Sequence, residues 1–159
     1  MNYKAKKKYG QNFLENKEIL NEIFSHVDLD SEDTVIEIGP GLGFLTETLS
    51  DNVKKVYSFE IDTDLVGILN KKFADRENLE IIHTDFMEYD LSKILNDKKN
   101  VKVVANIPYY ITSPIINKLI EFGENISEIY IMVQKEVAQR ISAVSPSKDV
   151  SILTHSVQF

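Results

Sequence analysis

A short apolar run followed by closely spaced glycines is the first stretch of the sequence whose residue types could bind a ligand. Residues 35–38 read Val-Ile-Glu-Ile, and glycines follow at positions 39, 41 and 43. The run predicts a short buried strand, and the apolar spacing from Phe44 onward predicts a helix directly after it. Such a turn presents backbone N–H groups, and glycine lets a ligand approach them closely. The stretch therefore predicts a ligand-binding turn or, alternatively, a tight turn in which glycine serves close packing.

The spacing of this turn excludes two common phosphate-binding motifs. Phe44 stands where the dinucleotide fingerprint G-x-G-x-x-G needs its last glycine. No Gly-Lys-Ser/Thr follows, so the turn is not a P-loop. An acidic residue before G-x-G-x-G, here Glu37, instead resembles the first motif of S-adenosylmethionine-dependent methyltransferases.

Further polar residues stand where other predicted strands end. Glu60 lies about 20 residues past the first glycine, where a nucleotide-binding fold places an acid on the ribose hydroxyls. The alternative for Glu60 is a surface carboxylate. Asp85 and Asn106 follow two later apolar runs. Because ligands of parallel sheets bind outside the carboxyl ends of the strands, we expect Gly39, Glu60, Asp85 and Asn106 to meet at one edge.

The stretch Asn106-Ile107-Pro108-Tyr109 has residue types that could position a weakly nucleophilic amine. It resembles the Asn/Asp-Pro-Pro-Tyr-like motif of methyltransferases that act on exocyclic amines of bases. The adenine amine is a poor nucleophile because its lone pair is delocalised into the ring. The Asn106 side-chain oxygen and a carbonyl near Pro108 can accept its N–H bonds, and Tyr109 can stack on an extruded base, worth about 1–3 kcal/mol. The alternative is an ordinary turn with a packed tyrosine.

The segments between these residues alternate between strand and helix patterns. Strands are predicted at 35–38, 55–59, 79–82, 101–105 and 129–133, and helices over apolar stripes that begin near residues 19, 44, 62, 91, 113 and 135. Asp62 or Thr63 is the expected cap of one helix, and Ser113 with Pro114 the expected start of another. Repeated alternation predicts a single α/β domain with a parallel sheet and right-handed crossovers. The last ten residues fit helix and strand equally well.

The composition limits the classes of protein to consider. The chain has 159 residues, of which 43% are hydrophobic and 27% charged, as in soluble globular proteins. No apolar run approaches the ~20 residues of a membrane span, and no signal peptide opens the chain, so we expect a cytoplasmic protein without a membrane partner. With no cysteines and three scattered histidines, neither a disulfide nor a metal centre is expected.

The charge distribution is uneven. A net charge of −7 argues against a broad nucleic-acid-binding surface. Four lysines nevertheless crowd the N-terminus: Lys4, Lys6, Lys7 and Lys8. They are interpreted either as an RNA-binding arm that contacts phosphates or as a solvated terminus.

An ordered set of short motifs resembles the ribosomal-RNA adenine dimethyltransferase family. The motifs are Tyr9–Leu14, Glu37–Gly41, Glu60–Asp62, Asp85–Phe86, Asn106–Pro114 and Gln134–Ala138. The resemblance covers nearly the whole chain and is strongest to the kasugamycin-sensitivity branch. It implies a Rossmann-like class I S-adenosylmethionine-dependent methyltransferase fold. It also implies transfer of methyl groups to the exocyclic amine of two adjacent adenines in small-subunit rRNA, a step of ribosome biogenesis.

The resemblance implies a role for each matching position. Residues that would bind the cofactor, S-adenosylmethionine, are Asn12, Leu14, Gly39, Gly41, Glu60, Asp85 and Asn106. Within this set, Asn12 and Leu14 would close over the cofactor, and the glycines would pass beneath its methionine portion. Glu60 would hold its ribose hydroxyls and Asp85 its adenine amine. The catalytic residues would be Asn106, Pro108 and Tyr109.

Three departures from the family pattern bear on these implications. Tyr110 stands where the erythromycin-resistance branch usually has asparagine, which favours the kasugamycin-sensitivity branch. Val150-Ser151 stands where many relatives have Tyr-Gly. Relatives continue past the position of Phe159 through two strands and a small helical domain that helps bind RNA. We therefore expect residues 1–159 to be a methyltransferase catalytic domain without those parts.

Two alternative functions stay open at this point. One is methylation of large-subunit rRNA adenine of the macrolide-resistance type. The other is an RNA-binding ribosome assembly factor in which transfer activity is secondary, as the basic N-terminal arm suggests. The oligomeric state does not follow from the sequence.

Overall fold

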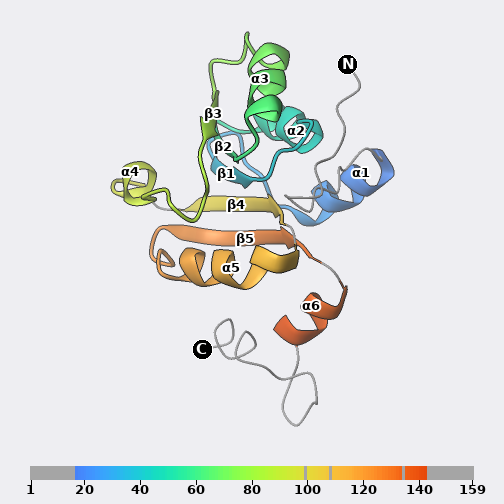
Figure 1. The fold of residues 1–159 in the computed structure, drawn as a ribbon, viewed down its shortest axis with the longest axis vertical. Helices are drawn as coiled ribbons and strands as arrows, with labels where there is room; N and C mark the ends of the chain where they lie inside the picture. The colour runs from blue at the N-terminus through green and yellow to red at the C-terminus, as the bar shows by residue number, and fades with distance from the viewer. Residues whose placement is uncertain (1–16, 99, 108, 134, 143–159) are drawn as a thin grey trace.

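The computed structural model describes residues 17–98, 100–107, 109–133 and 135–142. Helices and strands alternate along the chain (Figure 1). In order they are α1 (Lys17–His26), β1 (Thr34–Ile38), α2 (Phe44–Asn52), β2 (Lys55–Glu60), α3 (Thr63–Lys72), β3 (Leu79–His83), α4 (Ser92–Leu95), β4 (Val101–Asn106), a 3₁₀ helix (Tyr109–Ile111), α5 (Thr112–Ile120), β5 (Ile126–Met132) and α6 (Lys135–Ile141).

The strands form one five-stranded sheet in the order β3-β2-β1-β4-β5. Every neighbouring pair is parallel. The order runs outward from β1 in both directions, so the strand order reverses beside β1, where doubly wound sheets bind ligands. The predicted α/β fold with a parallel, Rossmann-like sheet is confirmed.

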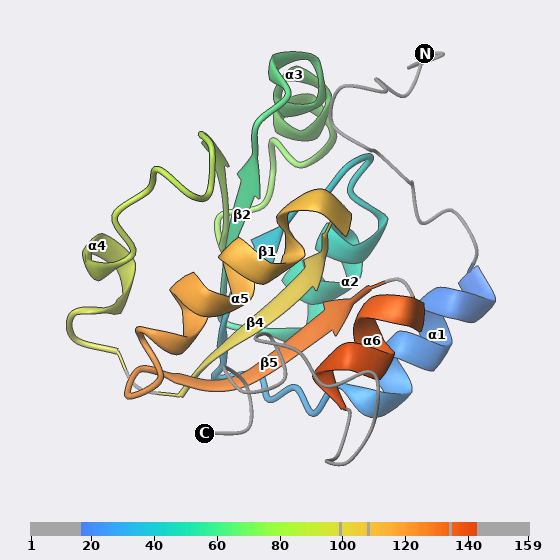
Figure 2. The same cartoon turned by 60° about the horizontal axis from the view of Figure 1, so that its bottom comes forward.

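The two faces of the sheet carry separate apolar cores because successive side chains of a strand point to opposite faces. In β1, Ile36 and Ile38 belong to one core, and Val35 belongs to the other. The first core is closed by α4 and α5, and the second by α1 and α2. In Figure 2, α5 crosses in front of the sheet and α2 lies behind it.

Most predicted strand positions are correct to within one residue, but β5 begins at Ile126 instead of residue 129. Ile126 is buried and pairs with Val101, whereas Ser127 and Glu128 interrupt the apolar run that marked the strand in the sequence. Among the strands that the structure describes, β5 pairs with β4 alone, and its side chains after Ile126 are exposed or half-buried. The apolar run therefore revealed only the second half of β5.

The predicted start of α5 is also wrong. The helix begins at Thr112, with Ile111 as its N-cap, so Pro114 is the third helical residue and not the first. Proline is tolerated there because the first N–H groups of a helix have no intrahelical acceptor. Asp62 is the N-cap of α3, and its side chain accepts a hydrogen bond from the Asp64 N–H, so the first of the two expected caps is correct.

Within the described ranges, the helices are all too short or too polar to cross a bilayer. The final ten residues, whose pattern fitted helix and strand equally, lie outside the described residues.

Candidate cofactor and substrate site

The ends of four adjacent strands bring the predicted site residues to one edge of the sheet. Ile38 pairs with Phe59 on one side and with Ala105 on the other. Gly39, Glu60 and Asn106, which each follow one of these residues, therefore lie next to one another. The predicted convergence of these three strand ends is confirmed.

Asp85 joins the same edge through the neighbouring strand. Glu60 pairs with His83 at the end of β3, and the Thr84 N–H donates to the Glu60 carbonyl at 3.1 Å. Asp85 directly follows Thr84 in the chain. Gly39, Glu60, Asp85 and Asn106 therefore all lie at the same rim of the sheet.

The glycine turn approaches the fourth strand so closely that it admits no side chain at its first position. Gly39 has φ +74°, and a Cβ placed on it would lie 2.9 Å from the Asn106 carbonyl oxygen. A Cβ on Gly43 would lie 2.7 Å from the ring of Phe73 on the far side of the turn. Glycine is thus required both for close packing and for a left-handed backbone. The two interpretations of the turn are compatible, because this packing also leaves its backbone at the rim.

Glu60 is buried against the glycine turn and held by backbone donors. Its Oε1 accepts from the Asp62 N–H at 2.9 Å, and its Oε2 accepts from the Gly41 N–H at 3.4 Å. Burial raises the pKa of Glu60, while the backbone N–H groups of Asp62, Gly41 and Ile61 oppose that shift. A carboxylate has about four acceptor positions, so two backbone donors leave capacity for ligand hydroxyls.

Asp85 is half-buried and braced by the turn that follows it. Its Oδ1 accepts from the Met87 N–H at 2.8 Å, and the Glu88 N–H donates to the Asp85 carbonyl at 3.0 Å. Its side chain is therefore fixed by its own turn, while the second carboxylate oxygen adds acceptor capacity for a donor such as an amine.

Asn106 ends β4 and is half-buried beside the glycine turn. The buried side chain of Ile107 anchors the chain behind it, and the 3₁₀ helix then leads into α5. Tyr110 in this helix is 53% exposed, so an aromatic ring faces solvent close to the Asn106 strand end. The arrangement offers an amide group and an exposed aromatic ring at the β4 end of the rim.

Several predicted site residues lie outside the described residues. These are Asn12, Leu14, Pro108 and the lysines Lys4, Lys6, Lys7 and Lys8. For Tyr109 the structure describes the backbone, as the first residue of the 3₁₀ helix. The roles of all these residues stay predictions.

Glu37, the acid before the glycines, supports the turn from below and has no role in the sequence-based prediction. It is fully buried in β1, where Oε1 accepts from the Thr46 hydroxyl at 3.0 Å and Oε2 accepts from the Ser58 hydroxyl at 2.7 Å. Burial raises the pKa of Glu37 to about 7, against the two hydroxyl donors, which lower it. Glu37 thus joins the first turn of α2 to β2 beneath the glycine turn. An acid inside an otherwise apolar strand was the available signal.

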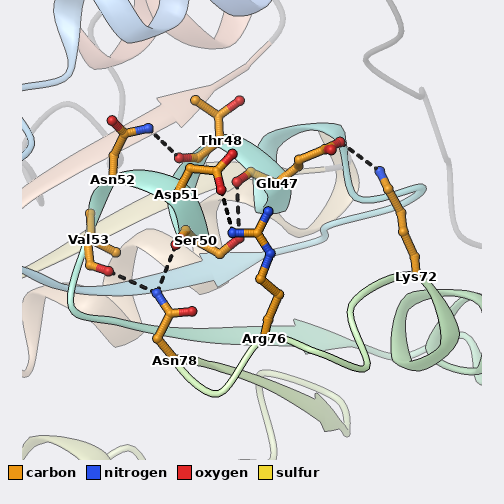
Figure 3. A network of polar contacts seen from close by, with 9 residues as sticks. All are labelled: Glu47, Thr48, Ser50, Asp51, Asn52, Val53, Lys72, Arg76 and Asn78. Atoms are coloured by element: carbon orange, nitrogen blue, oxygen red, sulfur yellow. Dashed lines mark hydrogen bonds and ion pairs between the residues drawn. The ribbon is translucent and has the colours of Figure 1, made fainter.

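A polar network holds α2, and with it the glycine turn, against the segment from α3 to β3 (Figure 3). Lys72 pairs with Glu47 at 3.1 Å and also donates to the Gly43 carbonyl at 3.2 Å. At the other end of α2, Arg76 pairs with Asp51. Asn78 Nδ2 donates to the carbonyls of Ser50 and Val53 at 2.8 and 3.0 Å, respectively. Contacts at both ends fix the helix, so the turn before it has a defined position.

The polar groups at the rim suit an organic ligand. In the part of the chain that the structure describes, no three His, Cys, Asp or Glu side chains are grouped so as to hold a metal. The rim instead combines backbone N–H groups, two carboxylates and an amide, which suit a ligand with hydroxyls, amines and a carboxylate.

Comparisons with known proteins agree with this geometry. Residues 2–159 match the family model described as ribosomal RNA adenine dimethylase. The chain is 54% identical over its full length to ribosomal RNA small subunit methyltransferase A of Fusobacterium nucleatum subsp. nucleatum. It is 43% identical over 99% of its length to the protein of the same name from Clostridium botulinum. It spans 60% and 57% of these two relatives, respectively.

Solved structures share the fold. A dimethyladenosine transferase from Plasmodium falciparum superposes with a TM-score of 0.81 at 34% identity, over 92% of this chain and 52% of that one. The 23S rRNA methyltransferase ErmE superposes with a TM-score of 0.72 at 31% identity, over 81% of this chain and 50% of that one. The predicted class I methyltransferase fold is confirmed by these neighbours.

Proposed function

Because the chain belongs to the ribosomal RNA adenine dimethylase family, we propose that it transfers methyl groups from S-adenosylmethionine to adenine amines of small-subunit rRNA. The product would be N6,N6-dimethyladenosine at two adjacent adenines, made in the cytoplasm during ribosome biogenesis. The observation that carries the proposal is the meeting of the glycine turn, Glu60, Asp85 and Asn106 at one rim of the sheet.

The residues at the rim fit the proposed cofactor. A carboxylate that accepts two ribose hydroxyls must be held by other donors, and the backbone N–H groups of Asp62 and Gly41 hold Glu60 in this way. The closely packed Gly39 leaves backbone, and no side chain, beside Asn106, which suits passage of the methionine portion. Asp85 would accept from the adenine amine. The cofactor supplies a methyl group carried on a positively charged sulfur.

Asn106 would position the amine of the target base. Its side-chain oxygen can accept one of the two N–H bonds of that amine, which favours a localised lone pair on nitrogen. No strong base would be needed to begin the reaction, because the amine would attack as a neutral group while the sulfur–methyl bond breaks and leaves a neutral sulfur. The nitrogen, made cationic by the new bond, would then lose its proton to water. Alignment of the reacting groups is then the main contribution, and such proximity can supply about 7–11 kcal/mol.

The small subunit is the preferred substrate because both curated relatives described above are named for it. A structural neighbour named for 23S rRNA makes the large subunit the specific alternative. Tyr110 stands where the erythromycin-resistance branch usually has asparagine, and this departure from that branch favours the small subunit as well.

The test is transfer of labelled methyl groups from S-adenosylmethionine to small subunits that lack the dimethylated adenines, with naked large-subunit rRNA in parallel. We expect label in small-subunit adenine only, as the dimethylated base. Asn106→Ala should lower transfer about 100-fold or more, because a misplaced reacting group alone has an effect of that size. The variant should still bind S-adenosylhomocysteine in a calorimetric titration.

Three results would contradict the proposal. Label in large-subunit rRNA alone would reverse the choice of substrate. Absence of S-adenosylhomocysteine binding would exclude S-adenosylmethionine as the cofactor. Near-normal turnover by Asn106→Ala would show that Asn106 does not position the amine. Small-subunit maturation supported by Asn106→Ala, without transfer, would favour the assembly-factor alternative.

A further inference from the structure

The ammonium group of Lys118 is directed at the turn that follows Asp85. Lys118 lies in α5, and its Nζ donates to the carbonyls of Phe86, Met87 and Tyr89 at 2.8, 2.8 and 2.6 Å, respectively. An ammonium group has three N–H donors, so these acceptors account for all of them. Its Nζ also lies 5.3 Å from the centroid of the Phe86 ring. One side chain of α5 thus fixes the backbone of the whole turn.

A single peptide group connects Lys118 with the Asp85 carboxylate. The carbonyl of Phe86 accepts from Lys118, and the N–H of the same peptide group, that of Met87, donates to Asp85 Oδ1 at 2.8 Å. A cation on the carbonyl oxygen polarises the peptide group and strengthens its N–H as a donor. Lys118 therefore acts on the orientation of Asp85 without touching it.

The placement of Lys118 is not needed to dock α5. The apolar side of that helix is already buried through Ile115, Ile116 and Leu119. Burial lowers the pKa of Lys118, and the charges of Asp85, Glu121 and Asp90 oppose that shift. A half-buried cation whose N–H groups donate to three carbonyls of one turn suits a role in shaping that turn.

The connection spans both sides of the rim. α5 follows the Asn106 strand end and the 3₁₀ helix directly, whereas Asp85 follows β3 at the opposite end of the site. Lys118 thus provides a polar connection from the substrate-side helix to the cofactor-side turn, beside the apolar contacts of the shared core.

We propose that Lys118 is a positioning residue that orients Asp85 toward the exocyclic amine of the cofactor's adenine, through the Phe86–Met87 peptide group. This rests on the proposed function, because it assigns the adenine end of the cofactor to Asp85. It predicts that Lys118 governs recognition of that amine and not binding in general.

The test compares S-adenosylhomocysteine with S-inosylhomocysteine, in which the amine is replaced by oxygen, by calorimetric titration. Lys118→Met keeps the unbranched stem over Phe86 and removes the charge. We expect it to weaken S-adenosylhomocysteine about tenfold, the size of one charge-assisted hydrogen bond, and to leave S-inosylhomocysteine nearly unchanged. A merely structural role would weaken both ligands equally.

Matched variants complete the design. Lys93→Met removes an exposed lysine whose Nζ lies 5.7 Å from the centroid of the Tyr89 ring in the same turn, and should leave both affinities unchanged. Lys118→Gln keeps an amide donor without the charge and should shift the preference in the same direction, but less. It serves as the test if Lys118→Met does not fold, as judged by circular dichroism.

The outcomes separate this inference from the proposed function. If the unaltered chain binds neither ligand, the proposed function fails. If the unaltered chain prefers the amine, Asp85→Ala loses that preference and both Lys118 variants keep it, the inference about Lys118 is overturned while the proposed function stands. If the Lys118 variants lose the preference as Asp85→Ala does, the inference is supported.

Discussion

The two ends of the parallel sheet hold their buried charges in different ways. At the amino ends of the strands, Lys102 of β4 pairs with Asp33 at 2.9 Å and with Glu128 at 3.5 Å, and donates to the Asp28 carbonyl. Burial disfavours the charge of Lys102, but its hydrogen bond to Asp33 and the charges of Asp33 and Glu128 raise its pKa overall. The charges at this end are paired with one another.

At the carboxyl ends, the carboxylates are held by neutral donors instead. Glu37 is held by two hydroxyls, Glu60 by the backbone of Asp62 and Gly41, and Asp85 by the backbone of Met87. At Glu60 and Asp85, neutral donors fix an oxygen in place but leave the negative charge and further lone pairs to meet a ligand. The comparison leads us to expect that the amino end serves stability and that the carboxyl end serves the proposed binding.

The largest effect should come from the charge of Glu37. Its pKa of about 7 in the folded chain lies above the reference value of 4.5, so the unfolded chain loses this proton first as the pH rises. The contribution of Glu37 to stability is therefore fully present below pH 4.5 and is lost as the pH rises through 7, by about 3 kcal/mol in total. Glu37→Gln has no carboxyl group to ionise at this position. The free energy of unfolding of this variant, relative to that of the unaltered chain, should therefore increase with pH. Urea unfolding from pH 5 to 8 measures the difference.

Parallel stability curves for the two chains would contradict this account of Glu37. The m-value serves as the control, because an unchanged slope shows that the variant alters stability and not the surface exposed on unfolding.

The next effect should come from the amino end. Lys102→Met leaves Asp33 and Glu128 without their buried partner and should lower the free energy of unfolding by about 2 kcal/mol, less than for a fully buried pair because Glu128 is partly exposed. The affinity for S-adenosylhomocysteine should not change. Lys54→Met is the matched control, because it removes an exposed pair with Glu32 and should leave stability unaltered.

A Lys102→Met chain that keeps its stability but loses cofactor affinity would break the comparison. It would mean that the charges at the amino end serve binding and not the fold.

The smallest effect should come from Glu60→Gln, which should change the affinity for the ligand and not lower the stability. Removing the charge should weaken S-adenosylhomocysteine about tenfold, since hydrogen bonds to charged groups are stronger than neutral ones. Stability should stay the same or rise, because burial raises the pKa of Glu60 and so opposes its charge. Glu80→Gln, an exposed carboxylate on the neighbouring strand, is the control. Loss of stability without loss of affinity would assign Glu60 to the fold.

The sequence predicted the placement of site residues better than the contacts that hold them. Gly39, Glu60, Asp85 and Asn106 each follow an apolar run, and parallel pairing brings such positions together whatever the exact register. Strand positions were therefore sufficient to predict the rim. The start of β5 at Ile126 was missed because Ser127 and Glu128 interrupt the apolar run there.

The supporting contacts could not be read from the sequence because they join residues far apart in the chain. Lys118 reaches a turn about 30 residues earlier, and Lys72 reaches the Gly43 carbonyl across two elements. In a sequence, a helical lysine is interpreted as a solvated charge. Only the packing of α5 and α3 shows which carbonyls each ammonium group contacts. The environment of Glu37 was partly predictable. The sequence shows its apolar neighbours in the strand but not its two hydroxyl donors.

The most direct test of the claim that the carboxyl end binds the cofactor is a two-dimensional ¹⁵N–¹H spectrum of the chain recorded during titration with S-adenosylhomocysteine. The amide signals of Gly41, Asp62 and Met87, which donate to Glu60 and Asp85, should shift and saturate together. The amide signals of Asp28 and Lys102 at the amino end should stay in place. Saturable shifts confined to the amino end, or none at the rim, would contradict the account.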